Sequence, residues 1–282
     1  MIAKRLNQDA RVFAAATLAE DGATPLDVAI DAATAGGFDG LSLWASSYLN
    51  EQRNGISDQE MRDRLDAANL CVDHVEAVIA WAGPDDPGAP YAEESSRHEV
   101  FAAAQALHAP VVSVLLFGTR SASEDDAADV FATIAHEASS FGLSVALEFA
   151  LGTVIRDVAS AGRVTSGPNN GGILYDTWLA HYGPSTIEDL AALHGDQILA
   201  IQVNDGAEER PDDYGVATRR RRTPLGEGAF LLPDMVRTLR AIGCDAPLTV
   251  EVFNDDLVRE LGPKAFAQRL AGGWESLSRK YV

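Results

Sequence analysis

The chain has 282 residues and a formal net charge of −20, with 46% hydrophobic and 23% charged residues. This length and composition predict a globular protein with a large core, and the negative charge argues against nucleic acids as partners because it repels phosphate backbones. No apolar run approaches a membrane span, and residues 1–13 contain no apolar segment typical of an export signal. We therefore expect a cytoplasmic protein with no membrane partner.

Runs typical of β-strands alternate along the chain with longer runs typical of α-helices. The expected strands are RVFAAATL (11–18), FDGLSLW (38–44), CVDHVEAVIAW (71–81), PVVSVLLFG (110–118), LSVALEFA (143–150), GGILYDTW (171–178), ILAIQVND (198–205) and LTVEVFND (248–255). The helical runs between them include PLDVAIDAATAGG (25–37), DQEMRDRLDAANL (58–70), RHEVFAAAQALH (97–108), EDDAADVFATIAHEASSFG (124–142), TIEDLAALHG (186–195) and LPDMVRTLRAIG (232–243). Several of these runs end in glycine shortly before the next strand, a signal typical of a helix end.

Strict alternation of strands and helices predicts a parallel sheet. Eight such units in one chain favour a single-domain (β/α)8 TIM barrel of the α/β class over an open doubly wound sheet. We expect this barrel to span residues 1–282, with 1–10 as an N-terminal extension. No G-x-G-x-x-G turn follows the first expected strand, which argues against a dinucleotide-binding fold.

Four consecutive strands in the second half each place one oxygen-bearing side chain on the inward face, near the carboxyl end of the strand. Alternation along SVALEF, ILYDT, LAIQVND and LTVEVF turns the large apolar residues outward. The residues that this phase turns inward are Glu148, Asp176, Gln202 and Glu251. Barrel enzymes carry their chemistry at the carboxyl end of the strands, so these residues are the first candidates for a site.

We expect these four side chains to hold one divalent metal ion. Three anionic oxygen ligands and one neutral one suit Mn²⁺ or Mg²⁺, with Co²⁺ as an alternative, whereas zinc prefers nitrogen or sulfur. Such an ion polarises a substrate carbonyl, so that a carboxylate can remove the neighbouring proton and an enediolate forms. Isomerisation, epimerisation and dehydration share that intermediate and stay open. The alternative is that each side chain is a separately satisfied polar group at a strand end.

Other residues are candidates for binding substrate. Arg222 and, less directly, Arg219 follow the seventh strand and could fix an anionic or hydroxyl group, although RRRR (219–222) also reads as a solvated basic run. The remaining candidates are polar or aromatic residues of the second, third and sixth expected strands, each of which packing alone would also explain. They are His74, Glu76, Trp44 and Trp178.

At these positions the sequence resembles the xylose isomerase-like TIM-barrel superfamily of sugar isomerases, epimerases and dehydratases, in order and spacing along essentially the whole chain. That family holds its metal with Glu, Asp, His or Gln, and Glu on strands five to eight. The matching motifs here are ALEF with Glu148, LYDT with Asp176, IQVND with Gln202 and VEVFND with Glu251. The resemblance implies that Glu148 and Glu251 also act as the acid–base pair in catalysis.

Three features look most like bacterial 3-dehydroshikimate dehydratases: Gln in the third ligand position, the ending E-x-F-N-D, and R-x-x-R-x-x-x-G-x-G over residues 219–228. In those dehydratases a catalytic His follows the metal-binding Asp by three positions. This chain has Leu179 there, and its nearest histidine, His181, lies two residues further on. A local turn could still bring His181 to the substrate.

We therefore expect a metal-dependent isomerase or epimerase acting on a small sugar-like hydroxyketone or polyol. A lyase of the 3-dehydroshikimate or inosose dehydratase kind is the alternative, and a non-catalytic ligand-binding barrel is a further one. A DNA-repair endonuclease with this barrel would need several histidines to hold zinc, whereas the six histidines here are dispersed. The segment AWAGPDDPGAPYAEESSRHEV (80–100) is expected to form a lid or to contribute to a homo-oligomer.

Overall fold

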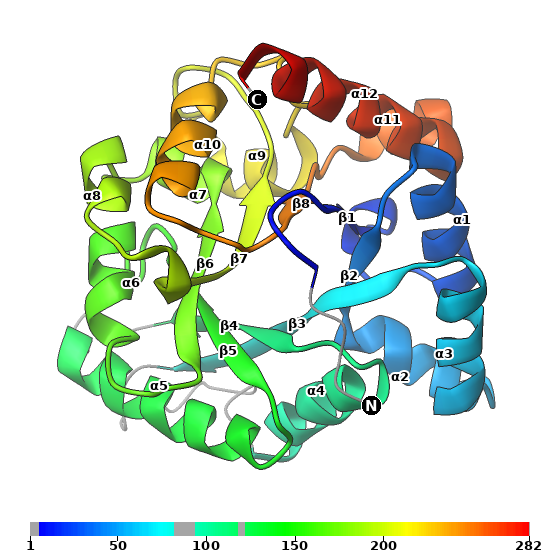
Figure 1. The fold of residues 1–282 in the computed structure, drawn as a ribbon, viewed down its shortest axis with the longest axis horizontal. Coiled ribbons are helices and arrows are strands. Elements are labelled where there is room, and N and C mark those ends of the chain that lie inside the picture. Colours follow the sequence, from blue (N-terminus) through cyan, green and yellow to red (C-terminus); the bar gives the residue numbers. More distant parts are fainter. Residues whose placement is uncertain (1–5, 82–93, 118–121, 282) are drawn as a thin grey trace.

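Parallel strands pair in chain order and close on themselves, because the first strand also pairs with the last. The computed structural model describes residues 6–81, 94–117 and 122–281, and in these residues the barrel consists of eight strands surrounded by helices (Figure 1). The strands are β1 (Arg11–Ala14), β2 (Gly40–Trp44), β3 (Cys71–Trp81), β4 (Val111–Phe117), β5 (Ser144–Glu148), β6 (Gly171–Asp176), β7 (Ile198–Val203) and β8 (Leu248–Val250). The predicted (β/α)8 barrel is thus confirmed.

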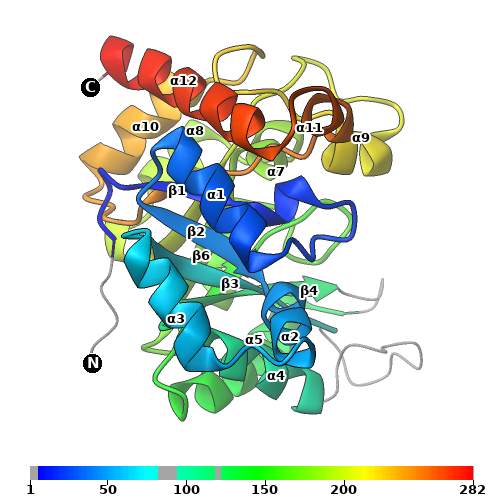
Figure 2. The ribbon, with the colours of Figure 1, turned by 90° about the vertical axis from the view of Figure 1, so that its right-hand side faces the viewer.

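Helices form the outer layer, and α1 packs along α12 near the point where the barrel closes (Figure 2). The helices are α1 (Leu26–Gly36), α2 (Ala45–Arg53), α3 (Asp58–Ala67), α4 (Glu94–Ala106), α5 (Glu124–Ser139), α6 (Val158–Val164), α7 (Thr177–Tyr182), α8 (Ile187–Ala191), α9 (Tyr214–Arg220), α10 (Leu232–Ala241), α11 (Asp255–Leu261) and α12 (Pro263–Tyr281), with short 3-10 turns η1 (Ala15–Leu18) and η2 (Gly195–Gln197). Of the helices in the described part of the chain, none has the length and apolar character that a bilayer crossing requires.

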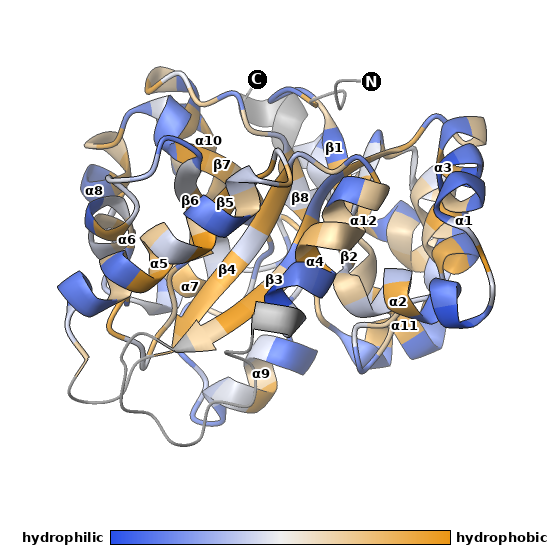
Figure 3. Cartoon of the chain, turned by 90° about the horizontal axis from the view of Figure 1, so that it is seen from below, coloured by the Kyte–Doolittle hydropathy of each residue, from blue (hydrophilic) through white to orange (hydrophobic). Residues whose placement is uncertain are grey.

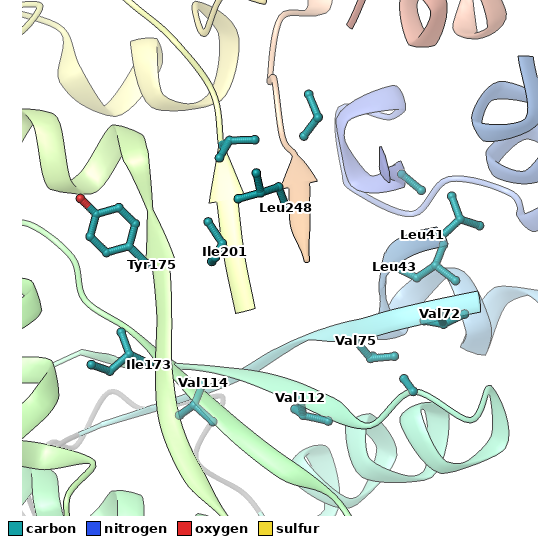
Figure 4. Close-up of a cluster of buried hydrophobic side chains, with 14 of the residues drawn as sticks. Leu41, Leu43, Val72, Val75, Val112, Val114, Ile173, Tyr175, Ile201 and Leu248 are labelled. Carbon is teal, nitrogen blue, oxygen red and sulfur yellow. The ribbon is translucent and has the colours of Figure 1, made fainter. Parts of the chain in front are cut away.

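The core has two layers, as strand alternation predicts. Outward-facing strand residues such as Val145, Ile173 and Ile201 belong to one large cluster under the helices. Figure 4 shows Ile173 and Ile201 in that cluster, and β3 and β4 are largely apolar in Figure 3. A separate small cluster of inward residues, which includes Ala146 and Leu174, fills the barrel interior. The phase that turns Glu148, Asp176 and Gln202 inward is therefore confirmed for these strands.

Most expected strands are a few residues shorter in the structure than predicted, and the first and the last lose half of their length or more. The segment 11–18 is a strand only to Ala14, and η1 follows it because the Thr17 hydroxyl donates to the Ala14 carbonyl and closes a turn. The segment 248–255 is a strand only to Val250, which pairs with Phe13 near the end of the short β1. Glu251 therefore lies just beyond the strand, although its backbone N–H still donates to the Val203 carbonyl at 2.9 Å.

Two short helices that begin directly after a strand, α2 and α7, were not expected, and neither was α9 in the segment after β7. The expected strand 171–178 ends at Asp176 because the Asp176 side chain accepts a hydrogen bond from the backbone N–H of Trp178 and caps α7. Residues 82–93 of the expected lid or oligomer segment lie outside the described residues.

Candidate active site

A cavity of about 550 Å³ opens at the carboxyl end of the barrel strands. Its polar lining includes four ionisable groups and one amide from β3, β5, β7 and the segments after β7 and β8, namely Glu76, Glu148, Arg222, Glu251 and Gln202. Apolar side chains line another part, among them Trp44, Leu115, Leu179 and Phe253, and further charged residues such as Glu20 and Asp255 also line the cavity. Charged side chains beside an apolar wall are typical of a binding site for a small polar molecule.

Arg222 is the buried cation of this site. One guanidinium nitrogen, Nη1, lies 3.0 Å from Asp176 Oδ2 and 2.8 Å from Glu251 Oε2. All three side chains are at most 5% exposed, so these ion pairs are barely screened by solvent. Glu251, whose burial in an apolar environment would be costly without compensation, thus has a protein cation as its partner.

The Arg222 side chain is also held by uncharged contacts. Its Nε donates to the Thr218 carbonyl at 3.0 Å. The guanidinium carbon lies 5.6 Å from the ring centroid of Trp178 and 5.2 Å from that of Phe253, so the cation stands between two aromatic rings. Trp178 is itself fully buried, and its indole N–H donates to the Thr218 hydroxyl.

Asp176 accepts three hydrogen bonds. While Oδ2 accepts from Arg222, Oδ1 accepts from the backbone N–H of Trp178 at 2.6 Å and from the Asn204 amide at 3.0 Å. Asp176 is fully buried, and it ends β6 while capping α7. Its orientation is therefore determined by the backbone and by two side chains together.

Gln202 has one unused polar atom. Its Nε2 donates to Glu251 Oε1 at 2.9 Å, whereas its Oε1 is buried and has no hydrogen-bond partner in the described residues. With the amide turned the other way, the Gln202 oxygen would face Glu251 Oε1, and the two oxygens would repel each other. A buried amide oxygen that lacks a donor can accept a hydrogen bond from a molecule bound in the cavity, or it can ligate a metal ion.

Glu148 is the unpartnered carboxyl group of the site. It ends β5, lines the cavity, and makes no hydrogen bond or ion pair with the described residues. Burial, reinforced by the negative charges of Asp176 and Glu76, raises the pKa of Glu148 to about 8. A carboxyl group with this pKa exchanges protons near neutral pH, which is the property of a general acid or base.

Glu251 experiences opposing influences. Burial and the negative charge of Glu76 raise its pKa well above the usual value, and Arg222 lowers it without cancelling the rise. The two carboxyl groups predicted to form an acid–base pair, Glu148 and Glu251, thus differ in their partners: one is free and the other is tied to Gln202 and Arg222.

A second buried group of charges lies on β3. His74 Nδ1 is 2.9 Å from Asp73 Oδ2, and its Nε2 is 3.5 Å from Glu76 Oε1. Burial lowers the pKa of His74, but the hydrogen bond to Asp73 and the nearby carboxylate of Glu76 prevail and raise it to about 10. Glu76 also accepts from the Ser42 hydroxyl at 3.1 Å, and its pKa is lowered despite burial because His74 is next to it. Glu76 is therefore an anion in the cavity lining, and His74 is its counter-ion.

Three of the four expected metal ligands, Glu148, Gln202 and Glu251, line the cavity. The fourth, Asp176, lies beneath it and is linked to Glu251 through Arg222. Among the described residues no group of three His, Cys, Asp or Glu side chains stands in an arrangement that could hold a metal ion. The donor chemistry nevertheless fits a hard divalent ion, because the three carboxyl groups are joined by Gln202 Oε1, a buried oxygen without a donor. The donor types thus suit a metal ion, whereas the positions of Asp176 and Glu251 in this structure suit the guanidinium of Arg222.

Of the other candidates from the sequence, some line the cavity and others lie outside it. Trp44 and Arg219 line the cavity, Arg219 as an exposed residue of its rim. Trp178 lies behind Arg222 and not in the cavity wall. His181 is not brought to the site: it stacks on Phe230 at 4.0 Å between ring centroids and lines a different hollow. Leu179 occupies the cavity wall instead.

Three residues of the site were missed in the sequence. Tyr214 of α9 lines the cavity, and its hydroxyl is buried without a hydrogen-bond partner in the described residues. Asn204 and Asp73 position Asp176 and His74. Asn204 was visible as the next inward position after Gln202, whereas Tyr214 follows a polar loop and carries no pattern that points to the barrel mouth.

The sequence matches the family described as xylose isomerase-like TIM barrel over residues 30–274. No curated protein sequence matches the chain. Among solved structures, a protein named IolI, in a crystal structure described with a bound zinc atom, has a TM-score of 0.81 at 19% identity, over 97% of this chain and 99% of that one.

Two further structures are similar. A fusion of a xylose isomerase-like TIM barrel with a 4-hydroxyphenylpyruvate dioxygenase has a TM-score of 0.81 at 18% identity, and the match covers 99% of this chain but 44% of the fusion protein. D-allulose 3-epimerase from Methylomonas sp., in complex with D-allulose, has a TM-score of 0.70 at 15% identity, over 99% of this chain and 98% of that one.

Proposed function

Because the chain belongs to the xylose isomerase-like TIM-barrel family, we propose that it is an isomerase or epimerase that moves a proton within a small sugar-like hydroxyketone or polyol. The observation that carries this proposal is Glu148, a carboxyl group without a protein partner whose pKa is raised to about 8 at a cavity. The epimerase from Methylomonas sp., whose structure contains D-allulose, supports a ketose as the type of substrate.

Glu148 is the proposed base that removes the proton next to the substrate carbonyl, since it has no hydrogen bond to give up before it reacts. Glu251 is the proposed partner acid, which returns a proton from another side of the substrate. A divalent ion held by Glu148, Asp176, Gln202 and Glu251 would supply Lewis-acid polarisation of the carbonyl. The all-oxygen donor set favours Mn²⁺ or Mg²⁺ for this position.

The remaining lining residues would orient the substrate. Arg219 at the rim and Arg222 in the floor offer guanidinium groups to hydroxyl or anionic groups. Trp44 supplies a flat apolar wall for the C–H face of a sugar. Glu76, ionised beside His74, offers an acceptor for a substrate hydroxyl.

A dehydratase is less well supported than an isomerase. In the dehydratases that the sequence resembles, a histidine stands where this chain has Leu179, and Leu179 lines the cavity with a side chain that carries no proton. Since His181 lies in another hollow, it does not replace that histidine. Dehydration would therefore have to use Glu148 or Glu251 alone.

The proposal is tested by incubating the protein with Mn²⁺ in deuterated water with D-allulose and a panel of related ketoses. Proton NMR should show a new ketose or aldose with deuterium on the carbon next to the carbonyl. Glu148→Gln should lower kcat by about 10²- to 10⁴-fold, the usual contribution of a general base. The exposed control Glu99→Gln, on the outer face of α4, should react like the unmodified protein.

Equal turnover by Glu148→Gln and the unmodified protein would remove Glu148 from the mechanism. Tight binding of a ketose without deuterium incorporation would favour the ligand-binding barrel. A conjugated, ultraviolet-absorbing product from 3-dehydroshikimate would instead identify a dehydratase.

A further inference from the structure

We propose that Arg222 is the resident cation of the site, and that its guanidinium and a divalent metal ion exclude each other at Asp176 and Glu251. In this proposal the metal-free protein is held together by Arg222, and metal entry turns the guanidinium out toward the cavity. The inference rests on the metal site included in the proposed function, but it requires no substrate and no turnover.

The first support is that the position of Arg222 is built by contacts of different kinds. Two carboxylates, one carbonyl and two aromatic rings surround the guanidinium. The backbone is held as well, because the N–H of Arg222 donates to the Phe253 carbonyl and its carbonyl accepts from the Asn254 amide. A side chain with this many contacts is part of the site's structure.

The second support is the balance of charge. The neighbours that act most strongly on Glu251 are the carboxyl groups of Glu76, Asp176 and Glu148 and one cation, Arg222. The other buried cation described nearby, His74, is already shared between Asp73 and Glu76. Without Arg222 or a metal ion, Asp176 and Glu251 would be left as neighbouring buried carboxylates, which is a costly arrangement.

The third support is that both cations would use the same oxygen atoms. Nη1 of Arg222 contacts Asp176 Oδ2 and Glu251 Oε2, and Asp176 Oδ1 is occupied by Asn204 and by the backbone of α7. Because Oδ1 already accepts two hydrogen bonds, we expect a metal ion that takes Asp176 to use Oδ2, the oxygen that Arg222 now contacts. Two positive groups at hydrogen-bond distance in a buried site also repel each other strongly.

The fourth support is that Arg222 borders the cavity. Its side chain lines a cavity of about 550 Å³, and we expect the guanidinium to move away from Asp176 into that cavity when a metal ion enters. There it would face the substrate, and metal binding would thus also place Arg222 to anchor the ligand.

The test compares Mn²⁺ binding by calorimetry for the chelator-treated protein, Arg222→Met and the control Arg221→Met. Arg221 is exposed and pairs with Asp213 outside the site. Removing a competitor should make Arg222→Met bind Mn²⁺ about tenfold or more tightly than the unmodified protein. Arg222→Met should also melt at a lower temperature without metal and recover on addition of Mn²⁺, while Arg221→Met should change neither property.

Weaker or equal Mn²⁺ binding by Arg222→Met would overturn the inference, and so would the absence of Mn²⁺ binding by both forms. If Arg222→Met does not fold, a crystal of the unmodified protein soaked in Mn²⁺ decides the matter. The inference requires that Arg222 Nη1 no longer contacts both carboxylates, and a bound ion beside an unmoved Arg222 would contradict it. None of these outcomes involves turnover, so they are separate from the test of Glu148.

Discussion

At the scale of single residues, buried charge in this barrel is arranged as pairs around two cations. His74 pairs with Asp73 and Glu76, and Arg222 pairs with Asp176 and Glu251. Glu148 alone is left without a partner in the described residues, and it is also the group whose raised pKa suits proton transfer. The paired carboxyl groups of Asp176 and Glu251 thus contribute to stability, whereas the unpaired Glu148 is the group suited to proton transfer.

His74 makes stability depend on pH at alkaline values. Its pKa is raised from 6.5 to about 10 in the folded protein, so its charged form contributes stability that is fully present below pH 6.5 and is lost as pH rises through 10. Urea unfolding followed by circular dichroism should show the free energy of unfolding falling between pH 8 and 10, by an amount on the order of a few kcal/mol.

The window begins at pH 8 because Glu148, with its raised pKa of about 8, is half titrated there and contributes progressively less above it. Glu148 acts in the same direction, since a raised folded pKa means that stability is lost as pH rises. His74→Asn removes this titrating group, so its unfolding free energy should be lower at pH 7 and should fall less steeply from pH 8 to 10 than that of the unmodified protein. An unchanged slope in this variant would show that the alkaline loss arises elsewhere.

At the scale of elements, the segment between β7 and α10 is organised by Asp205. Its carboxylate accepts from the backbone N–H groups of Gly206, Gly226 and Phe230, and its own backbone pairs with Thr223. A Cβ on Gly228 would overlap the Asp205 side chain and the Gly206 backbone, whereas Gly226 has a positive φ and open space around it. This packing directs the chain that carries Arg222 back across the barrel mouth.

Gly228→Ala should therefore be the more damaging of two matched substitutions. We expect it to lower the free energy of unfolding by about 3 kcal/mol, as overpacking against backbone does. Gly226→Ala, which brings only the cost of a positive φ, should lower it by about 1–2 kcal/mol. Chemical denaturation of both variants measures the difference, and an equal loss would show that the contact at Gly228 relaxes freely.

The same scale shows why strand ends were predicted less well than strands. The apolar run at 171–178 passes without a break from β6 into α7, because Trp178 is buried in the helix as fully as the strand residues are in the sheet. Asp176 marks the boundary through its cap hydrogen bond, but its position in LYDT equally suits a ligand. Hydrophobic periodicity alone does not separate these roles.

At the scale of the whole molecule, the net charge of −20 has a measurable consequence. Like charges on the surface repel one another, and salt screens this repulsion. The melting temperature should rise as NaCl increases from about 0.01 M to 0.5 M, over which the screening length falls severalfold. A control at constant ionic strength with added sucrose separates screening from general solute effects, and a fall in melting temperature with salt would contradict the prediction.

The alternation of strands and helices was sufficient by itself to predict the barrel, its chain order and the inward phase of Glu148, Asp176 and Gln202, because side-chain direction along a strand follows from local geometry. Which charges meet was decided only by the tertiary structure. Arg222 is 46 residues from Asp176 and 29 from Glu251 along the chain, and nothing local indicates that one guanidinium reaches both. Closure of the barrel and the return of the loop after β7 bring them together, because pairing among buried charges depends on distance in space.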